Sequence, residues 1–427
     1  MENFVLLTKG YNCRMTIAII GAGASGMAAA LQAAWKGAAV TLFERNESVG
    51  RKLLVTGSGR CNITNEAVKA AQYACADTAW MKTLLQAFGV RDLLSMLASI
   101  GIPVQKTADG WYYPLSNSAQ SVVEAFSSAL QLAGVQVVCQ AQVTSLRAGK
   151  PGFLVQYSLN GKKQEQPFER VIVSAGGAAY PALGSRGELF PVLERLGHTV
   201  LPMRPALAPL VVTLGSLRAL QGMRLNVGVR LWQGSQQLAA TRGNLIFTEW
   251  GLNGPAVMDI SHHVSANPGA GLELSLNLLE YVQEDFDHLL EQKRESDMPV
   301  HVFLDAFFPP KVSAVYLKNA RLPEDIPLSQ VDDDALQRLM QRLHDTRLAV
   351  KDVRGFEFCQ VSAGGVPVSE VNPRTLESLR VKNLYLTGET LDVVGPCGGY
   401  NLQFAFSSGA LAGKAVVQKG NLSLRGG

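Results

Sequence analysis

The chain has few cysteines and histidines, and none of them is spaced like a metal or redox site. Its six cysteines are scattered and include no CxxC pair: Cys13, Cys61, Cys75, Cys139, Cys359 and Cys397. This spacing argues against zinc, iron–sulfur and thioredoxin-type sites and leaves reduced thiols as the default. His262 and His263 are neighbours, but no two histidines have the spacing of metal ligands on a helix. We therefore predict no metal site.

Long apolar runs are missing as well. No uninterrupted apolar stretch approaches membrane-spanning length, and residues 1–14 lack the apolar centre and cleavage site of a signal peptide. We therefore expect a cytoplasmic protein without a membrane partner, in which residues 1–14 are a frayed extension or an artefact of start-codon choice. Charged residues make up 17% of the chain and the net charge is +4. This mild excess permits an RNA partner without requiring one.

The sequence does contain a dinucleotide-binding fingerprint. TIAII, residues 16–20, reads as a buried strand, and GAGASG follows it. In this motif Gly21 makes the tight turn, Gly23 lets the backbone approach a pyrophosphate, and Gly26 lets the helix pack on the strand. A helix rich in alanine and a second strand, AAVTLF, lead to Glu44, which is placed to accept both hydroxyls of an adenosine ribose. The unit predicts bound FAD or NAD rather than a cofactor with a 2′-phosphate.

Local patterns outline the rest of the chain. The polar, glycine-rich and basic residues 45–65 predict a functional loop with little regular structure. Residues 78–99 and 118–133 have helical patterns, and an Asn160-Gly161 turn between two apolar runs is a strong hairpin signal. Arg224 to Trp232 alternates between polar and apolar residues, which predicts a half-buried antiparallel strand.

These patterns also suggest how the domains are arranged. A chain of 427 residues is long enough for two or three domains. Because α/β patterns return from residue 356, we expect the cofactor domain to be discontinuous. The predicted division is a cofactor domain at residues 1–194 and 349–427, a β-rich substrate domain at 195–280 and a helical subdomain at 281–348.

Longer motifs then occur in a fixed order along the chain. They are GAGASG with Glu44, GRKLLVTGSGRCNITN, YPALGSRG, FTEWGLNGPA, QVSAGGV and TGETLDVVGPCGGYNLQFAFSSG. In this order they resemble the BaiN/RdsA-type family of FAD-dependent flavoproteins, which is related to the glutathione-reductase superfamily. The chain departs from the family pattern at residues 174–177, where ATGG is more usual, and at Glu249-Trp250, where a histidine and an aromatic are usual. The second departure bears on the substrate more than on the fold.

The resemblance implies an α/β fold: a discontinuous Rossmann-like FAD-binding domain with an inserted antiparallel β domain and a small helical domain. It also implies that Glu389, at the end of a predicted strand, bonds the ribityl chain of FAD. The alternative is a solvated loop acid. The helix that begins near Asn401 is placed to stabilise negative charge on the reduced flavin, although Asn401 is also an ordinary helix cap.

A basic cluster on the 45–65 loop is the other cofactor candidate, because neighbouring glycines suggest close approach of the backbone to a ligand. A solvated charged face is the alternative. The full set of residues expected to contact FAD is Gly21, Gly23, Ala24, Ser25, Gly26, Glu44, Arg45, Arg51, Lys52, Gly59, Arg60, Cys61, Asn62, Val143, Ala175, Gly176, Gly177, Gly388, Glu389, Gly399, Tyr400, Asn401 and Leu402.

Four residues are candidates for proton transfer. Cys397 and Cys61 lie in glycine-rich loops expected at the flavin, where a thiol could protonate a carbon as a hydride arrives. Buried packing is the alternative role for both. Tyr400 and Tyr180 compete for the same function.

Family resemblance implies a hydride transfer from reduced FAD to a carbon–carbon double bond conjugated to a carbonyl. The implied substrates are uridine in large-subunit ribosomal RNA, giving dihydrouridine, and steroid enones of bile-acid type. The sequence has a single fingerprint, so NAD(P)H would have to reach the flavin transiently. Five arginines against one acid in residues 201–250 weakly favour RNA. The alternatives are an amine oxidase that uses O2 and a flavin-bearing or ribosome-associated binding protein without turnover.

Overall fold

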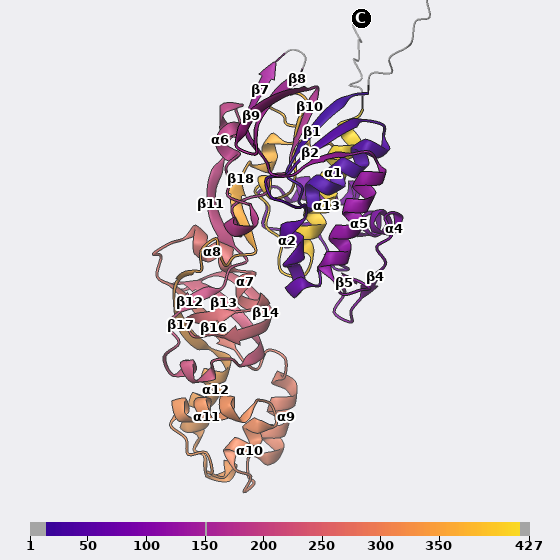
Figure 1. Ribbon diagram of the computed structural model, residues 1–427. Coiled ribbons are helices and arrows are strands. Elements are labelled where there is room, and N and C mark those ends of the chain that lie inside the picture. Colours follow the sequence, from indigo (N-terminus) through magenta and orange to yellow (C-terminus); the bar gives the residue numbers. More distant parts are fainter. Residues whose placement is uncertain (1–13, 150–151, 419–427) are drawn as a thin grey trace, which may run out of the picture.

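The computed structural model describes residues 14–149 and 152–418. The expectation about the N-terminal extension, and Cys13 with it, therefore falls outside the described residues. The molecule is elongated, with a cofactor domain at one end, a β-barrel in the middle and a group of helices at the far end (Figure 1). None of the described helices combines the length and the apolar character that a membrane crossing needs.

A five-stranded parallel sheet forms the centre of the cofactor domain. Its strands lie in the order β19-β10-β1-β2-β6, with bounds Leu384–Leu386, Arg170–Val173, Thr16–Ile20, Ala39–Phe43 and Gln136–Val138. Residues 17–20 of β1 are all buried, as is usual for a parallel sheet that is covered on both faces. This sheet and its βαβ unit confirm the predicted Rossmann-like fold.

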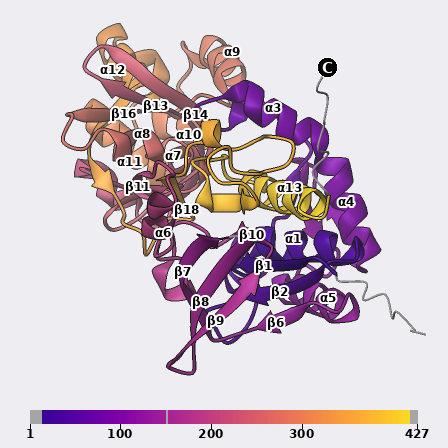
Figure 2. The ribbon, with the colours of Figure 1, turned by 90° about the horizontal axis from the view of Figure 1, so that it is seen from above.

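Helices cover one face of this sheet. Helix α1 (Ala24–Trp35) packs along α13 (Tyr400–Ala415), and α5 (Ala119–Leu132) lies next to α1 (Figure 2). The close approach of α1 and α13 depends on glycine. A Cβ atom at Gly409 would lie 2.0 Å from the Ser25 carbonyl oxygen, and one at Gly413 would lie 2.3 Å from that of Ala29. Larger side chains would therefore push α13 away from α1.

A three-stranded antiparallel sheet covers the other face. It consists of β7 (Ala141–Gly149), β8 (Gly152–Leu159) and β9 (Lys162–Phe168). Asn160 and Gly161 join β8 to β9 with φ of +51° and +75°, as a type I′ hairpin turn requires. Tyr157 packs on Phe43 of the parallel sheet with ring centroids 4.8 Å apart. The predicted hairpin is confirmed.

The loop after β2 has more structure than predicted. Residues 45–65 contain α2 (Arg51–Leu54), the 3₁₀ turn Thr56–Gly59 and β3 (Thr64–Asn65), so the prediction of little regular structure was wrong here. Gly50, with φ of +70°, starts α2, and the burial of Leu53 holds it in place. Strand β3 joins β5 (Trp111–Pro114) and β4 (Val104–Lys106).

Residues 78–99, which were expected to form one helical segment, form two helices instead. They are α3 (Thr78–Ala87) and α4 (Val90–Ser99), and Gly89 lies between them.

A closed six-stranded barrel forms the middle of the molecule. Its order is β12-β15-β14-β13-β16-β17, with bounds Leu210–Val212, Gly251–Asn253, Gln236–Phe247, Arg224–Gln233, Leu272–Asn277 and Thr346–Val353. The alternation predicted for residues 224–232 is confirmed, since Leu225, Val227, Val229 and Leu231 are all buried. The sequence indicated a β-rich domain, and the pairing of its strands closes them into a barrel.

Four helices are inserted between the last two barrel strands. They are α9 (Gln283–Lys293), α10 (Val300–Asp305), α11 (Pro310–Ala320) and α12 (Asp333–His344). Strand β17 follows them and pairs with both β12 and β16. The helices are therefore an insertion within the sequence of the barrel. The predicted boundary between residues 348 and 349 falls within β17.

Two strands connect the barrel to the cofactor domain. β11 (Leu201–Ala206) follows α6 (Phe190–Arg195) and pairs with β18 (Val361–Gly365) in an antiparallel ribbon. Two short helices, α7 (Pro255–Met258) and α8 (Ser261–Ala266), lie beside this connection. The β11–β18 ribbon and the short helices α7 and α8 therefore form the connection between the barrel and the cofactor domain.

Helix α8 carries a histidine that makes stability depend on pH. Burial lowers the pKa of His262 to about 4, and its ring lies 4.2 Å from that of His263. Because the unfolded chain binds the proton more readily, the free energy of unfolding should fall as pH drops from about 6.5 towards 4. We expect His262→Gln to reduce this loss by about 1 to 3 kcal/mol. Urea unfolding at a series of pH values measures it.

The matched control for this prediction is His288→Gln on the exposed side of α9. The control should keep the acid sensitivity of the wild type. Equal pH slopes for His262→Gln and the wild type would contradict the assignment to His262.

Candidate functional site

A cavity of about 580 Å³ lies at the carboxyl ends of the parallel strands. Ile20, Phe43 and Val173, the last residues of β1, β2 and β10, line it, as do the first turns of α1 and α13. Open α/β sheets bind ligands at this edge, and two helix N-termini direct their free N–H groups and positive dipole ends into the same space. Pro255 and Met258 of α7 extend the cavity wall towards the barrel.

The three fingerprint glycines have separate roles in the structure. A Cβ atom at Gly21 would lie 2.4 Å from the Ser174 carbonyl oxygen, and one at Gly26 would lie 1.8 Å from that of Gly21. These two glycines are therefore required by packing. A Cβ atom at Gly23, by contrast, would meet no protein atom within 4 Å, and Gly23 lines the cavity. The space in front of Gly23 is where a pyrophosphate would approach the backbone.

Glu44 lies at the cavity with its carboxylate already held in place. Its Oε2 accepts the Ala22 N–H at 2.9 Å, and its Oε1 accepts the backbone N–H and side-chain amide of Asn46 at 2.9 and 2.7 Å. A carboxylate has about four acceptor positions, so capacity remains for a ribose hydroxyl. This arrangement fits the predicted role of Glu44.

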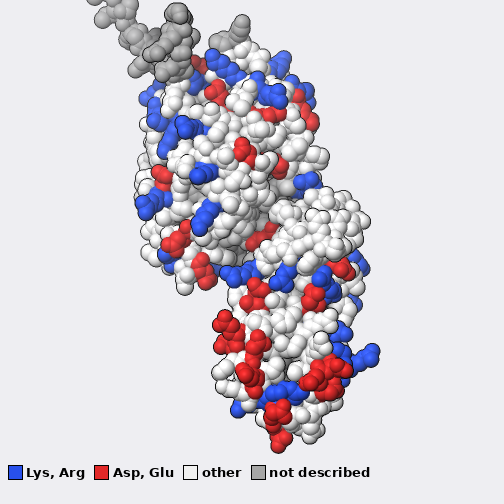
Figure 3. All heavy atoms as spheres, turned by 180° about the vertical axis from the view of Figure 1, so that it is seen from behind, with Lys and Arg blue, Asp and Glu red and all other residues white. Residues whose placement is uncertain are grey.

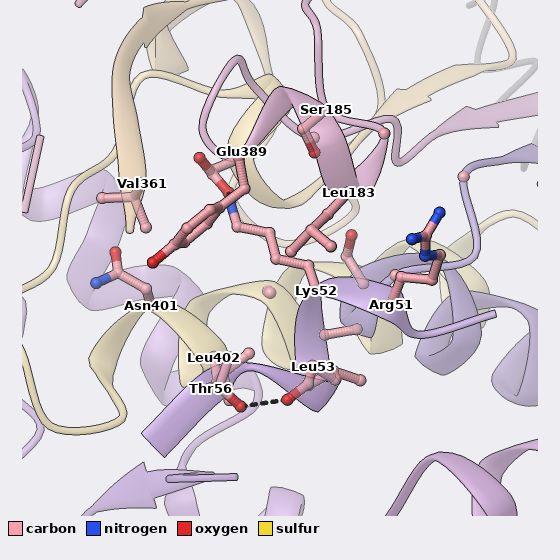
Figure 4. Close-up of a pocket in the computed structure, with 18 of the residues that line it drawn as sticks. Arg51, Lys52, Leu53, Thr56, Leu183, Ser185, Val361, Glu389, Asn401 and Leu402 are labelled. Atoms are coloured by element: carbon pink, nitrogen blue, oxygen red, sulfur yellow. Dashed lines mark hydrogen bonds and ion pairs between the residues drawn. The ribbon is translucent and has the colours of Figure 1, made fainter. Parts of the chain in front are cut away.

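Lys52 and Glu389 form an ion pair at the cavity wall. Lys52 Nζ lies 2.5 Å from Glu389 Oε2, while Glu389 Oε1 accepts the Ser362 N–H at 2.9 Å. Figure 4 shows Lys52 extending from α2 towards Glu389, with Arg51 pointing to the opposite side. Arg51 Nη1 instead donates to Asn46 Oδ1 at 3.2 Å, beside Glu44. The two basic residues therefore serve different ends of the cavity.

The N-terminus of α13 is built from two glycines with positive φ. Gly398 has φ of +103° and Gly399 of +94°, and a Cβ atom at Gly399 would lie 2.6 Å from the Thr64 backbone. The Asn401 side chain accepts the Gly395 N–H and donates to the Gly395 carbonyl, both at 2.8 Å. This pairing fixes the loop that enters the helix, and Asn401 and Leu402 both line the cavity.

The proton-transfer candidates lie in different surroundings. Cys397 lines the cavity, and its backbone N–H donates to Asp259 Oδ1 at 2.7 Å. Cys61 is fully buried, and burial raises the pKa of its thiol to about 11. Tyr400 is buried against Tyr73 and accepts a hydrogen bond from Gln72 at 2.9 Å. Tyr180 lines the cavity.

Most of the predicted cofactor residues line this one cavity. Within the described residues, the predicted members outside its lining are Gly26, Gly59, Cys61, Gly177, Gly388 and Tyr400. Several of these pack directly behind it: a Cβ atom at Gly388 would lie 2.7 Å from Ser25 Oγ, and one at Gly177 would lie 2.0 Å from Ser362 Oγ.

Other lining residues were missed by the sequence reasoning, among them Trp111, Leu207, Met258, Gln360 and Thr390. Thr390 follows Glu389 directly, so the strand-end motif could have indicated it. The others come from distant segments and carry no local signal of cofactor contact. Asp259, which contacts Cys397, was missed for the same reason.

The cavity is chemically suited to FAD. Asn62 Oδ1 and Thr390 Oγ1 are buried without a hydrogen-bond partner, and both residues line the cavity. Buried polar atoms are normally paired, so these two groups fit a polar ligand. Together with the open space at Gly23, they agree with an extended dinucleotide. Among the described residues, no group of three or more His, Cys, Asp or Glu side chains is arranged to hold a metal ion.

Comparison with known proteins agrees with this geometry. The family model described as the HI0933-like protein Rossmann domain matches residues 15–415. The 3-dehydro-bile acid delta(4,6)-reductase of Clostridium scindens is 35% identical over 412 residues, covering 94% of this chain and 99% of that protein. The ribosomal RNA dihydrouridine synthase of Escherichia coli is 30% identical over 400 residues, covering 92% of this chain and 96% of that protein.

Among solved structures, the 3-ketosteroid-delta4-(5alpha)-dehydrogenase of Rhodococcus jostii is similar in fold, with a TM-score of 0.52 and 14% identity over 97% of this chain and 99% of that one. The resemblance drawn from the sequence motifs is confirmed. The chain belongs to the HI0933-like Rossmann family of FAD-dependent oxidoreductases.

Proposed function

We propose that this protein reduces a carbon–carbon double bond conjugated to a carbonyl, with FAD as the bound cofactor and NAD(P)H as the transient electron donor. The observation that carries the proposal is the position of Cys397, which lines the cofactor cavity immediately before the glycines that open α13. A thiol and a helix N-terminus that favours negative charge therefore lie at the same wall of the cavity. The activities named for both relatives are consistent with it.

We assign different roles in this reaction to different residues of the chain. Bound and reduced FAD supplies a hydride. The N–H groups at the start of α13 favour negative charge nearby, and the Lys52–Glu389 pair fixes α2 against β18. In this proposal Cys397 protonates the α carbon of the substrate. Lys52, Glu389 and Cys397 all line the cavity, as does the first turn of α13.

Anaerobic mixing with NADH and with NADPH tests the redox reaction. We expect the flavin absorbance to bleach and to recover on addition of a steroid enone or of uridine-containing ribosomal RNA. Bleaching of the flavin by an amine, followed by recovery in O2, would favour an amine oxidase. A flavin that no nicotinamide reduces would favour a binding protein without turnover.

Two features of the structure bear on the substrate. Apolar Leu207, Met258 and Val361 line the cavity, which suits a steroid. On the barrel, strand pairing places Arg224 and Arg230 of β13 on the same outer face as Arg242 of β14, which suits RNA phosphates. The four inserted helices offer less to RNA, because residues 281–345 hold 13 acidic and 7 basic residues. Figure 3 shows acidic side chains gathered at that end.

If RNA is the substrate, Arg224→Ala with Arg230→Ala should weaken its binding. Loss of two phosphate contacts should also reduce the slope of log affinity against log salt by roughly 1 to 2, while bound FAD stays unchanged. Filter binding of a ribosomal RNA fragment at several salt concentrations measures both effects. Lys162→Ala with Lys163→Ala on exposed β9 removes the same charge from a distant sheet and is the matched control. Equal binding by both double variants would count against the barrel surface.

A further inference from the structure

Asp259 joins the barrel side of the cavity to the loop that enters α13. It directly follows α7, whose Pro255 and Met258 line the cavity. Its Oδ1 accepts the backbone N–H of Cys397 at 2.7 Å, although the two residues are 138 positions apart. Because Cys397 also lines the cavity, this contact fixes the thiol-bearing residue at the place where the two parts of the wall meet.

The same contact places a carboxylate beside a thiol. Burial raises the pKa of Asp259, while hydrogen bonds from Cys397 partly oppose the rise. The pKa of the Cys397 thiol lies well above its usual value, first because of burial and then because of the charge on Asp259. A neighbouring negative charge disfavours the thiolate, so the thiol keeps its proton to a higher pH than an ordinary cysteine does. The protonated form is the one that can act as an acid.

His262 and Tyr400 lie near Asp259, and His263 and Arg204 lie near His262. His262 and His263 lie on α8, and burial lowers the pKa of both, so they are neutral at pH 7. Arg204 of β11 lies near His262, and its Nε is buried without a hydrogen-bond partner. Tyr400 lies on the α13 side, and its pKa is raised mainly by burial and also by Asp259. Among these groups, Asp259 is the one that forms a hydrogen bond with Cys397.

We propose that Asp259 is a positioning residue that holds Cys397 in place and in its S–H form for proton donation. The inference rests on the proposed reduction. In that step the substrate gains a hydride at its β carbon, and the Cys397 S–H bond breaks as a C–H bond forms at the α carbon. The hydride would come from bound reduced FAD, which supplies the two electrons. The Cys397 thiolate recovers a proton from water, which leaves as hydroxide, so atoms and charge balance.

Asp259→Asn separates the charge from the hydrogen bond, because its amide oxygen still accepts the Cys397 N–H. The first measurement is the rate of Cys397 alkylation by iodoacetamide from pH 6 to 11, followed by mass spectrometry of the peptide. We expect its midpoint to move to lower pH by about one unit or more. The alkaline limb of the pH profile for product formation should move in the same direction. Asp259→Glu restores the charge and should return the midpoint towards that of the wild type.

Two controls accompany the measurement. Cys139, just after β6, reports alkylation of a distant thiol in the same samples and should not change. Asp392→Asn removes another half-buried carboxylate, which accepts the Gly364 N–H at 2.7 Å, and should leave the Cys397 midpoint unchanged.

Either of two results would overturn the proposal: an Asp259→Asn midpoint equal to that of the wild type, or a wild-type Cys397 midpoint at the ordinary value of about 8.5. The second needs no variant to fold. A wild-type protein that reduces neither an enone nor uridine would refute the proposed function instead, since the alkylation midpoints do not depend on turnover.

Discussion

Gly23→Val should give a folded protein that purifies without FAD. The added side chain meets no protein atom within 4 Å of its Cβ position, so the fold should tolerate it. It would, however, fill the space through which a pyrophosphate reaches the backbone. We expect loss of the flavin absorbance near 450 nm, with an unchanged circular dichroism spectrum.

Substitutions at two other glycines serve as controls for this experiment. Gly355→Val also places its Cβ atom in open space, but outside the cavity lining, and should retain FAD. Gly26→Val would force a Cβ atom to 1.8 Å from the Gly21 carbonyl oxygen and should prevent folding. Stoichiometric FAD in purified Gly23→Val would refute the placement of the pyrophosphate.

Cys397→Ser should lower the rate of product formation roughly a hundredfold or more, which is the usual contribution of a general acid. Serine keeps the size and the backbone N–H bond to Asp259 but is a much weaker acid. Reduction of the flavin by the nicotinamide should continue, because that step needs no proton from Cys397. Stopped-flow spectroscopy separates the two half-reactions.

Cys61→Ser provides the comparison. Cys61 is fully buried and lies outside the cavity lining, so its replacement should mainly change stability, by about 1 kcal/mol. Wild-type turnover by both serine variants would remove both thiols from the mechanism. Tyr180, which lines the cavity, would then be the next candidate, ahead of buried Tyr400 or an ordered water.

The sequence predicted those parts of the site whose signal is local. The fingerprint predicted β1, α1 and β2, and Gly388-Glu389 marked the end of β19, because these motifs combine strand, turn and helix within a few residues. Loop 45–65 was singled out as functional, and several of its residues line the cavity. Helix α2 within it was not predicted, because four residues are too few to show a helical period.

Contacts between distant segments had no such signal. Closure of the barrel depends on β17, which follows four helices and pairs with β12 about 140 residues earlier. The pairing of Asp259 with Cys397 spans 138 positions, and the fit of α13 on α1 depends on Gly409 and Gly413 meeting the backbone of another helix.

The sequence by itself determined the cofactor class, the family, the Rossmann-like core and barrel strand β13, since each depends on short-range spacing and periodicity. Tertiary structure alone decided which predicted residues share the cavity, which thiol reaches it, and which carboxylate stands beside that thiol. The physical reason is that burial, and with it the pKa of Cys61 and Cys397, depends on which distant segments pack together. Residue spacing along the chain carries no direct record of that packing.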